Sequence, residues 1–448
     1  MTTAAQALAA FATDLKYEQI PAEVIERAKL CMVDTVAAVT FGAGLPWSRI
    51  LAGHVRANSA AGHSSVVGAG FRVCAPGAAL ANGAAAHAFE LDSMCQPSVG
   101  SHPGAGLTSP GLAVAQALGR SGRELLTAFV AGSEVMYRIG DAGHHTSEQL
   151  GFHAPGLLGV FGGAVTAGLL MELDAGCLAN ALGVGGSMCS GLLEFSKSGG
   201  GMVKRLHLGR AAESAVTAAS LARDGFTGPA AVIEGKYGFL NVYCRDADAT
   251  RLTAGLGETW HTMKITLKRY PCHSTAHVAV TAALEIKNRH GVSGADIETI
   301  TIAGSEKMAS HHNIVEPRDI AMAQYSAPFC VALAFYRNPR DPGVYTEETV
   351  QDAAIRALCR KVKMEVRPES TGVNQLTTRI TVRLKDGREL TQELEHYPGM
   401  PRQPLDRAGM REKFDLLMAA LPKERADRIF AQFTELETVA DVGKLALE

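Results

Sequence analysis

The chain has 448 residues, of which 47% are hydrophobic and 20% are charged, and its formal net charge at pH 7 is −2. A chain of this length exceeds one core of ordinary size, so we expect two domains in a soluble globular protein. The near-zero charge, without any basic block, argues against a nucleic-acid partner and against electrostatic attachment to a membrane.

Three features of the sequence indicate the cellular compartment of the protein: its N-terminus, its apolar stretches and its cysteines. The first residues, MTTAAQALAAFATDLKYEQ, lack the basic start of a signal peptide. The apolar stretch 156–173 is broken by glycines, so we predict a buried helix rather than a membrane span. The nine cysteines are scattered without a Cys-x-x-Cys motif, and we expect most of them, including Cys95 and Cys272, to be reduced core residues. We therefore expect a cytoplasmic protein.

The chain up to about residue 265 is helical in pattern and dense in alanine and glycine. The first clear helix opens at Pro21 and closes at Gly42. Similar patterns cover residues 75–91, 121–143, 174–191 and 209–225. Small residues at three- and four-residue spacing let helix backbones approach closely, so we predict tightly packed helices and no strands in this part.

After residue 265 the pattern changes to that of a small α+β unit on an antiparallel sheet. Period-two alternation predicts strands at 298–304 and 363–368, and a hairpin over 377–394 that turns at Asp386-Gly387. Helical patterns lie between them at about 275–289 and 318–336, and helical patterning returns at 411–422 and 424–433. We therefore expect a mainly α fold: a large all-helical domain of residues 1–265, completed by residues 400–448, and a smaller inserted α+β lid domain of residues 266–399.

Two glycine-rich stretches resemble nucleotide-binding loops but lack their spacing. Residues 183–191 follow a helical pattern rather than a strand, so a dinucleotide site is not expected there. Residues 196–212 fail the P-loop spacing but bring Lys204, Arg205 and His207 to the start of a helix, which would suit an anion. On local sequence alone, a solvated basic turn is the favoured interpretation of this stretch, and the anion site is the alternative.

A second polar cluster, LKRYPCHSTAHVA, starts at Leu267. His273 and His277 have the spacing of two metal ligands on a helix, but no glutamate lies between them and no third ligand is near, so zinc is not favoured. Lys268 and His273 are cationic or donor groups at the predicted domain boundary, where clefts usually form.

The segment HAFELDSMCQPSVGSHPG, residues 87–104, ends an alanine-rich helix and then gathers Asp92, Gln96 and His102. His153 and Tyr325 are further polar residues in apolar surroundings, and for each alone a structural role is favoured over a functional one. A carboxylate, several imidazoles and two lysines together would suit a small polyanion and proton transfer next to a carboxylate.

Four motifs in this order resemble the MmgE/PrpD family: HAFELDSMCQPSVGSHPG, GFHAPGLLG, KRLHLGRAA and LKRYPCHSTAHVA. That family includes 2-methylcitrate dehydratase, cis-aconitate decarboxylase and iminodisuccinate epimerase, and the resemblance covers essentially the whole chain. It implies a large helical domain, an α+β lid, a homodimer, and an active site between the domains that needs neither an organic cofactor nor a metal.

The resemblance also implies which residues form the active site. Asp92 and His102 match the family's acid and catalytic histidine, and the positions that match its substrate cleft are His153, Lys204, Lys268, His273 and Tyr325. Ser93 and Gln96 depart from the pattern of many members, so the 2-methylcitrate reaction does not follow for this chain.

Our leading hypothesis is a cofactor-independent lyase, a dehydratase or decarboxylase, acting on a small di- or tricarboxylic acid. We predict catalytic roles for Asp92, His102, His153 and Tyr325, and substrate binding by Gln96, Lys204, Lys268 and His273. An isomerase or epimerase that uses the same proton abstraction is the alternative within enzymes. Two further hypotheses are a non-catalytic carboxylate-binding protein and, least favoured, a metallohydrolase built on His273 and His277.

Overall fold

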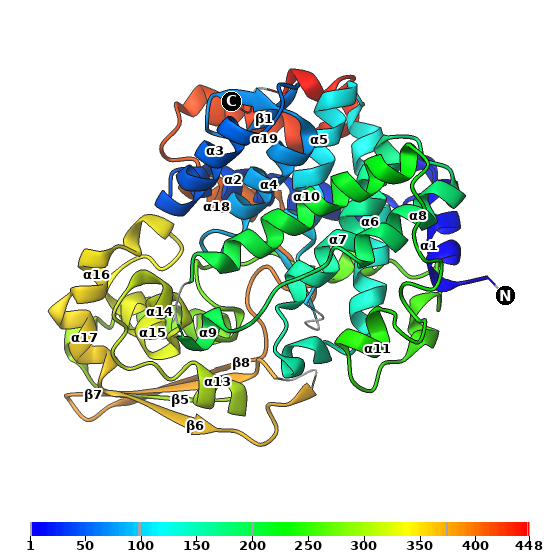
Figure 1. The fold of residues 1–448 in the computed structure, drawn as a ribbon. Coiled ribbons are helices and arrows are strands. Elements are labelled where there is room, and N and C mark those ends of the chain that lie inside the picture. Colours follow the sequence, from blue (N-terminus) through cyan, green and yellow to red (C-terminus); the bar gives the residue numbers. More distant parts are fainter. Residues whose placement is uncertain (1, 97–99, 199–200, 373–374, 446, 448) are drawn as a thin grey trace. The chain divides into compact units, whose positions relative to one another are not determined.

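The structure is a computed structural model that describes residues 2–96, 100–198, 201–372, 375–445 and 447 (Figure 1). Its internal contacts divide the chain into two compact units. The helical unit consists of Met1–Ala88, Asp92–Leu267 and Arg407–Glu448, and the α+β unit consists of Phe89–Leu91 and Lys268–Asp406.

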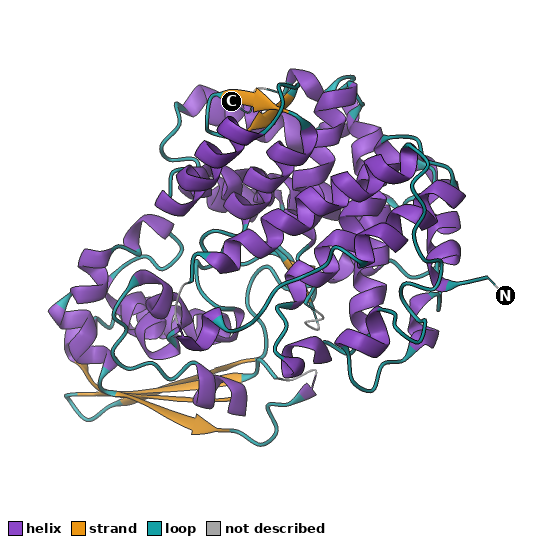
Figure 2. Cartoon of the chain, viewed as in Figure 1, coloured by secondary structure: helices purple, strands orange, loops and turns teal. Residues whose placement is uncertain are grey.

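The helical unit contains few strands (Figure 2). Its helices are α1 (Ala4–Asp14), α2 (Ala22–Ala43), α3 (Pro46–Asn58), α4 (Ala75–Ala86), α5 (Ser109–Leu118), α6 (Gly122–Ala142), α7 (Ala154–Leu170), α8 (Ala175–Gly186), α9 (Phe195–Ser198), α10 (Val203–Arg223), α11 (Phe239–Tyr243), α18 (Arg407–Leu417) and α19 (Lys423–Thr434). A π-helical turn, Gly104–Thr108, precedes α5. Short 3-10 turns lie at Tyr17–Gln19, Thr146–Leu150, Ala249–Leu252, His261–Lys264, Leu436–Thr438 and Val442–Lys444.

Glycines set the distance between the central helices of this unit. The long helix α10 packs against α4 and α7. A Cβ added at Gly209 of α10 would lie 2.6 Å from the carbonyl oxygen of Leu80 in α4, and one added at Gly83 would lie 3.1 Å from the Ala212 Cβ. The prediction of closely packed helices with small residues at their contacts is confirmed, because a larger side chain at Gly209 would push the two helices apart.

The prediction that this part of the chain has no strands was wrong. Strands β1 (Ser64–Val66) and β2 (Phe71–Val73) pair antiparallel, as do β3 (Met94–Cys95) and β4 (Ile265–Thr266). Two or three residues are too few to show an alternating pattern in the sequence. The β3–β4 pair matters for function because it fixes the chain immediately after Asp92.

The α+β unit contains one four-stranded sheet with the strand order β6-β5-β7-β8. The strands are β5 (Ile297–Gly304), β6 (Val362–Val366), β7 (Thr378–Leu384) and β8 (Glu389–Leu394). The helices are α12 (His277–His290), α13 (Glu306–His311), α14 (Ile320–Tyr325), α15 (Ala327–Tyr336), α16 (Glu347–Gln351) and α17 (Ala353–Cys359), with 3-10 turns at Ser274–Ala276, Gly294–Asp296 and Pro342–Val344. Helix α12 packs on β7, β8 and α15.

The predicted strands and hairpin of this unit are confirmed, with one correction. The β7–β8 hairpin turns at Asp386-Gly387, where Gly387 has a φ of 89°. The sheet is mixed rather than antiparallel, because β5 and β6 run parallel. Helices α13 to α17 form the long connection that a parallel pair requires.

Two further predictions concern single helices. The helix expected over 318–336 is divided into α14 and α15 at Ser326, whose hydroxyl accepts a hydrogen bond from the Phe329 N–H and so starts a new helix. The apolar stretch 156–173 forms the buried helix α7, as predicted.

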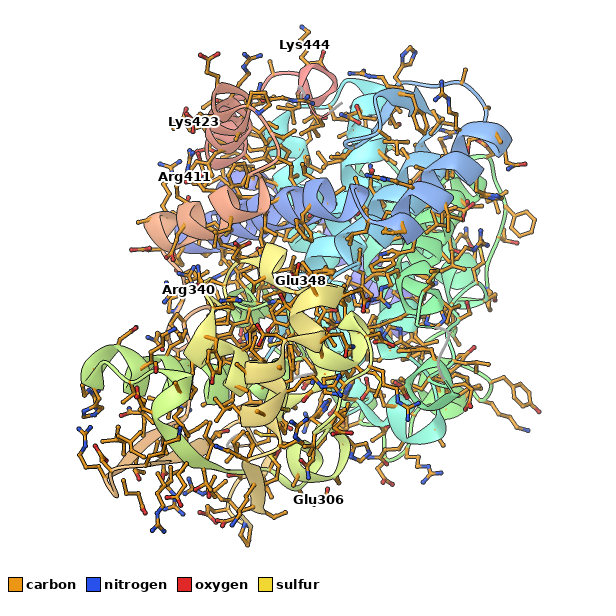
Figure 3. All side chains as sticks on the ribbon, turned by 90° about the vertical axis from the view of Figure 1, so that its left-hand side faces the viewer. Glu306, Arg340, Glu348, Arg411, Lys423 and Lys444 are labelled. Carbon is orange, nitrogen blue, oxygen red and sulfur yellow. The ribbon has the colours of Figure 1, made fainter. Side chains whose placement is uncertain are left out.

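Among the described residues no single helix has the length and apolarity to cross a membrane; α2 and α3 pass that test only as a pair bent by 90°. Charged side chains pair on the outer surface of the C-terminal helices, where Arg411 of α18 and Lys423 of α19 both bind Asp427 (Figure 3).

Candidate active site

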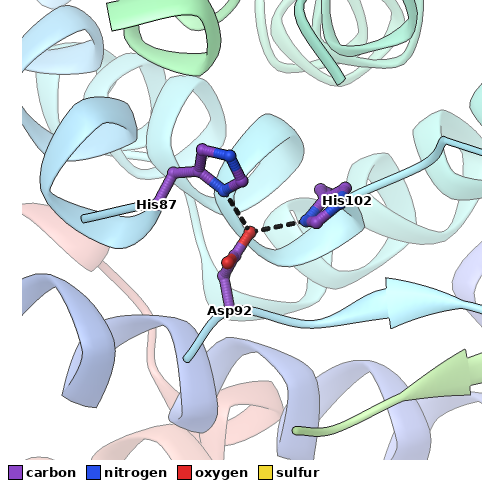
Figure 4. Close-up of side chains that lie close together, drawn as sticks. All are labelled: His87, Asp92 and His102. Carbon is purple, nitrogen blue, oxygen red and sulfur yellow. Dashed lines mark hydrogen bonds and ion pairs between the residues drawn. The ribbon is translucent and has the colours of Figure 1, made fainter. Parts of the chain in front are cut away.

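The centre of the candidate site is Asp92, whose carboxylate binds two imidazoles (Figure 4). Its Oδ2 atom lies 2.7 Å from Nδ1 of His102 and 2.8 Å from Nδ1 of His87. The side chain of Asp92 is 0% exposed and that of His87 1%, whereas that of His102 is 13% exposed. His102 is therefore the member of this group that solutes can reach.

Local structure explains how these three residues meet. Helix α4 ends at Ala86, so His87 is its C-cap and its side chain points out of the helix end. Asp92 lies just before β3, and the next residue, Ser93, accepts a hydrogen bond from the Gly104 N–H at 2.9 Å. That bond fixes the segment that carries His102 at the start of the π-helical turn, and such turns are frequent at functional sites.

Within the described chain, His87, Asp92 and His102 are the single group of three or more possible ligands whose donor atoms all lie within 4.8 Å. In a tetrahedral zinc site, ligand atoms would lie roughly 3.3 Å from one another. The nitrogen–oxygen distances of 2.7 and 2.8 Å are shorter than that and fit direct hydrogen bonds.

A second imidazole pair lies in the same unit. The Nδ1 atoms of His153 and His207 are 3.1 Å apart, so one donates its proton to the other. Burial lowers the pKa of both residues, and the charge of Lys204 lowers it further. His207 fits here because Gly191 lies beside its ring, where a Cβ would come within 3.2 Å of Nδ1.

The chain before α7 and the chain before α9 hold His153 in place. The His153 N–H donates to the Gly191 carbonyl at 2.9 Å, and the Leu193 N–H donates to Gly151 at 2.9 Å. The His153 ring lies 5.7 Å from the His87 ring, centroid to centroid. Four histidines of this unit thus form one continuous group around Asp92.

The start of α10 contributes the two cations predicted from the glycine-rich stretch, Lys204 and Arg205. Both are buried, each with 6% exposure, so the interpretation as a solvated basic turn is wrong. The Arg205 Nε donates to the carbonyl of Ala88 at 3.1 Å, and its guanidinium stacks over Trp47. Arg205 therefore fixes the chain next to His87, while the positive charge of Lys204 acts on His87, His153 and His207.

Gln96 lies at the end of β3, where its N–H donates to the carbonyl of Lys264 at 2.9 Å. Its side-chain amide contacts the sulfur of Met94 at 3.8 Å. Ser93, the other departure from the family pattern, contacts the Gly104 N–H and the Cys31 sulfur, so it ties the segment after Asp92 to the π-helical turn and to α2.

In the α+β unit, Lys268 forms a buried ion pair. Its Nζ donates to Oε2 of Glu90 at 3.2 Å, and each side chain is 3% exposed. Glu90 has a φ of 57°, which is unusual for a residue other than glycine. A strained backbone of this kind is common at functional positions, where surrounding contacts maintain it.

The remaining predicted residues of this unit, His273 and Tyr325, lie together with a third residue, His312. The His273 ring stacks on His312 with centroids 4.2 Å apart and lies 5.0 Å from the Tyr325 ring. Gln324 fixes the group, because its carbonyl accepts from the His273 N–H and its side chain donates to the carbonyls of Phe89 and Pro271. Burial lowers the pKa of His312 to about 4.

His273 and His277 do not share a metal-binding position. His273 Nδ1 lies 3.0 Å from the Thr275 hydroxyl, whereas His277 Nε2 lies 3.1 Å from the Cys272 carbonyl and its ring packs on Tyr270 and Tyr397. His277 is thus a core residue of the α+β unit.

The cysteines take no part in the candidate site. All nine are free, and burial raises the pKa of the Cys95 and Cys272 thiols well above the usual value. A buried thiol of this kind is a poor nucleophile, as the sequence predicted.

Residues that sequence reasoning missed support the predicted ones. His87, Glu90 and His312 each touch a predicted residue, yet none was assigned a role. His207, which the sequence analysis named only as part of a possible anion site, touches His153. Two signals in the sequence were available. His87 follows three alanines and is therefore a polar residue in an apolar run, and His207 is on the same predicted helix as Lys204. Their partners lie 5 to 178 positions away in the chain, so spacing alone does not connect them.

Comparison with known proteins matches the whole chain to one family. The MmgE/PrpD N-terminal domain matches residues 6–252 and the MmgE/PrpD C-terminal domain matches residues 270–436. Similar proteins include the cis-aconitate decarboxylase-like protein oryM of Aspergillus oryzae, which is 28% identical over 97% of this chain and 94% of its own length. The cis-aconitate decarboxylases of Aspergillus terreus and Homo sapiens are each 26% identical, over 97% and 89% of this chain and 93% and 84% of their own lengths.

Proposed function

Because the chain belongs to the MmgE/PrpD family, we propose that it is a lyase that decarboxylates or dehydrates a small di- or tricarboxylic acid. The similar proteins that are named cis-aconitate decarboxylases support the same reaction class. The panel of acids described below identifies the substrate and distinguishes decarboxylation from dehydration.

One observation carries the mechanism: His102 bonds through Nδ1 to the buried carboxylate of Asp92 and is itself partly exposed. Because Nδ1–H donates to Asp92, Nε2 is the atom that gives or takes a proton at the substrate carbon. The carboxylate orients the ring and stabilises its charged form, which is the usual role of an acid beside a catalytic histidine.

The two reactions differ in the direction of proton transfer. In dehydration, His102 removes the proton alpha to a carboxylate, the C–O bond on the neighbouring carbon breaks, and the hydroxyl group leaves as water with a proton delivered by His153 or Tyr325. In decarboxylation, carbon dioxide leaves with cleavage of the carbon–carbon bond, the electron pair stays on the substrate, and a protonated His102 returns a proton to carbon. General acid–base help of this kind contributes about 10²–10⁴-fold to the rate.

The other predicted residues receive supporting roles in the same proposal. His153 and Tyr325 assist proton delivery, and the substrate is held by Gln96, Lys204, Lys268 and His273. The two lysines suit this role because they can balance substrate carboxylates and the charge of an enolate-like intermediate. The chain itself links the two units at this point, since Glu90, the partner of Lys268, is two residues from Asp92.

We further propose that the enzyme is a cytoplasmic homodimer and needs neither a metal nor an organic cofactor. Light scattering of the purified protein tests the dimer. Turnover after exhaustive chelation tests the absence of a metal, and would also remove the metallohydrolase hypothesis.

The decisive experiment is a panel of acids followed by NMR in heavy water: citrate, 2-methylcitrate, cis-aconitate, malate and iminodisuccinate. A lyase gives a product that has lost water or carbon dioxide, and a decarboxylated product carries one deuterium on carbon. Deuterium in recovered acid, without either loss, would instead establish the isomerase or epimerase. A protein that leaves every acid unchanged would contradict the proposal.

A further inference from the structure

Asp92 has a second imidazole partner that the proposed mechanism does not use. The Oδ2 atom that binds His102 also lies 2.8 Å from Nδ1 of His87. Because an ionised carboxylate oxygen only accepts hydrogen bonds, Nδ1 of each histidine must carry a proton. His87 and His102 therefore divide the same oxygen between them.

His87 is held as a neutral donor. Its side chain is 1% exposed, and burial lowers its pKa to about 4 even though Asp92 acts in the opposite direction. With its proton on Nδ1, a neutral His87 has an unprotonated Nε2, and that atom is buried without a hydrogen-bond partner among the described residues. The negative charge on Asp92 is thus solvated by His87 but not cancelled by it.

Charged and titratable groups surround His87 and its partners. On α10 and before α7 these are Lys204, Arg205, His207 and His153, and His102 lies on the other side of Asp92. On α2 they are Cys31, which contacts Ser93, and Asp34, which pairs with Lys413. Lys204 and His102 both lower the pKa of His87. A cation in the place of His87 would cancel the negative charge of Asp92. A neutral N–H donor leaves that charge in place.

The position of His87 is rigid. Its N–H donates to the Gly83 carbonyl at the end of α4, and Arg205 Nε binds the carbonyl of the next residue, Ala88. Its ring stands at 86° to the His102 ring, with centroids 5.1 Å apart. The edge of one ring therefore meets the face of the other, which limits the rotation of both.

We propose that His87 is a positioning residue: as a second N–H donor on the shared Asp92 oxygen, it fixes the carboxylate and limits how strongly that carboxylate holds a proton on His102. This inference deepens the proposed function and rests on it for the role of His102 in turnover. A carboxylate with one donor concentrates its charge on that donor, whereas a carboxylate with two distributes it. His87 thereby keeps His102 able to release its proton as well as to take one up.

The first test needs no substrate. In protein labelled with ¹⁵N-histidine, NMR reports which nitrogen of each ring carries a proton, and the variants H87N and H102N assign the two residues. We expect His87 to be neutral and protonated on Nδ1 at pH 7. A proton on Nε2, or a charged His87, would overturn the proposal whether or not any variant folds.

The second test compares two substitutions at the same position. H87N keeps a side-chain N–H close to the place of Nδ1, whereas H87F keeps a ring and removes the donor. We expect the NMR resonance of the His102 Nδ1 proton to move downfield in H87F, because Asp92 then concentrates its charge on one donor, and to move clearly less in H87N. Equal resonance positions in wild type and H87F would overturn the proposal, and thermal unfolding shows whether each variant is folded.

Turnover provides the third readout and separates this inference from the proposed function. On whichever acid of the panel reacts, we expect kcat of H87F to be about tenfold below that of H87N, since a hydrogen bond to a charged group is worth about that factor. If no acid reacts, the proposed function fails, while the tautomer of His87 and the resonance of the His102 Nδ1 proton still decide the role of His87.

Discussion

The two units hold their histidines in different ways. In the helical unit, His87 and His102 share the buried carboxylate of Asp92. In the α+β unit, the buried carboxylate of Glu90 binds Lys268, and the imidazoles of His273 and His312 stack on one another instead. Burial lowers the pKa of His87 and of His312 to about 4, so both stay neutral at pH 7, and the partly exposed His102 is the other imidazole on the Asp92 carboxylate.

This difference suits the separate roles that we propose for the two groups. A proton-transfer residue must alternate between charged and neutral forms, which is the role proposed for His102 beside Asp92. A binding group must keep a constant charge, which is the role proposed for Lys268. We therefore expect substitutions of Asp92 and His102 to affect kcat, and substitutions of the Glu90–Lys268 pair to affect KM and stability.

The largest effect is expected at the shared carboxylate. H102N and D92N should each reduce kcat about 10³-fold, because in the proposed mechanism His102 gives or takes the proton at the substrate carbon and Asp92 supports its charged form. Steady-state kinetics on the reacting acid measures the loss. H290N, a change at an exposed histidine at the end of α12, is the matched control and should leave kcat unchanged. Near-full turnover of H102N would remove His102 from the mechanism.

The buried ion pair should give the next largest effect. K268M leaves Glu90 buried without its lysine and should lower the free energy of unfolding by about 3 kcal/mol, with a higher KM for the acid. The double variant E90Q/K268M removes both charges, so it should recover much of the stability that K268M loses. Its KM should stay as high as that of K268M. Denaturant unfolding and kinetics on the same preparations separate the two effects. Equal KM values in wild type and K268M would show that Lys268 does not bind substrate.

Acid should destabilise both units through their buried histidines. Burial lowers the pKa of His87 and of His312 to about 4 in the folded chain, against about 6.5 in the unfolded chain. At these two histidines the unfolded chain therefore binds up to two more protons between these values, so the stability present above pH 6.5 is lost as the pH falls towards 4, by up to about 3 kcal/mol per pH unit. In the helical unit His153, His207 and His261 add to this loss, because the pKa of each is also lowered by burial.

Hydrogen exchange at pH 7 and pH 5 would show whether this acid effect reaches both units. H312Q should flatten the pH dependence in the α+β unit, and H87N should reduce it in the helical unit, where His153, His207 and His261 remain. A pH dependence that both variants leave intact would place the responsible groups elsewhere.

The smallest effects concern packing. G209A should cost about 2 kcal/mol because its Cβ would meet the Leu80 carbonyl oxygen between α10 and α4. G387A should cost about 1 kcal/mol because alanine has to adopt the φ of 89° at the β7–β8 turn. G53A, at an exposed position of α3 with open space around it, is the control and should stabilise the protein slightly. Thermal unfolding of the three variants ranks these costs.

Much of the fold could be predicted because helix starts, buried helices and tight turns depend on short sequence patterns. The start of α2 after Pro21, the buried helix α7 and the turn at Asp386-Gly387 each follow from residues within one element. The parallel pairing of β5 with β6 could not be predicted, because direction in a sheet depends on how α13 to α17 return the chain. The β3–β4 pair joins residues about 170 positions apart, and no local signal marks it.

The sequence by itself determined the residue types of the candidate site and the family to which the chain belongs, since both depend on short motifs in a fixed order. Only the tertiary structure decided which of these residues touch. His87 meets Asp92 because α4 ends where it does, and His207 meets His153 because Gly191 leaves room for its ring. The physical reason is that hydrogen bonds and charge effects act over a few ångströms in space, and the folded backbone, not sequence separation, sets those distances.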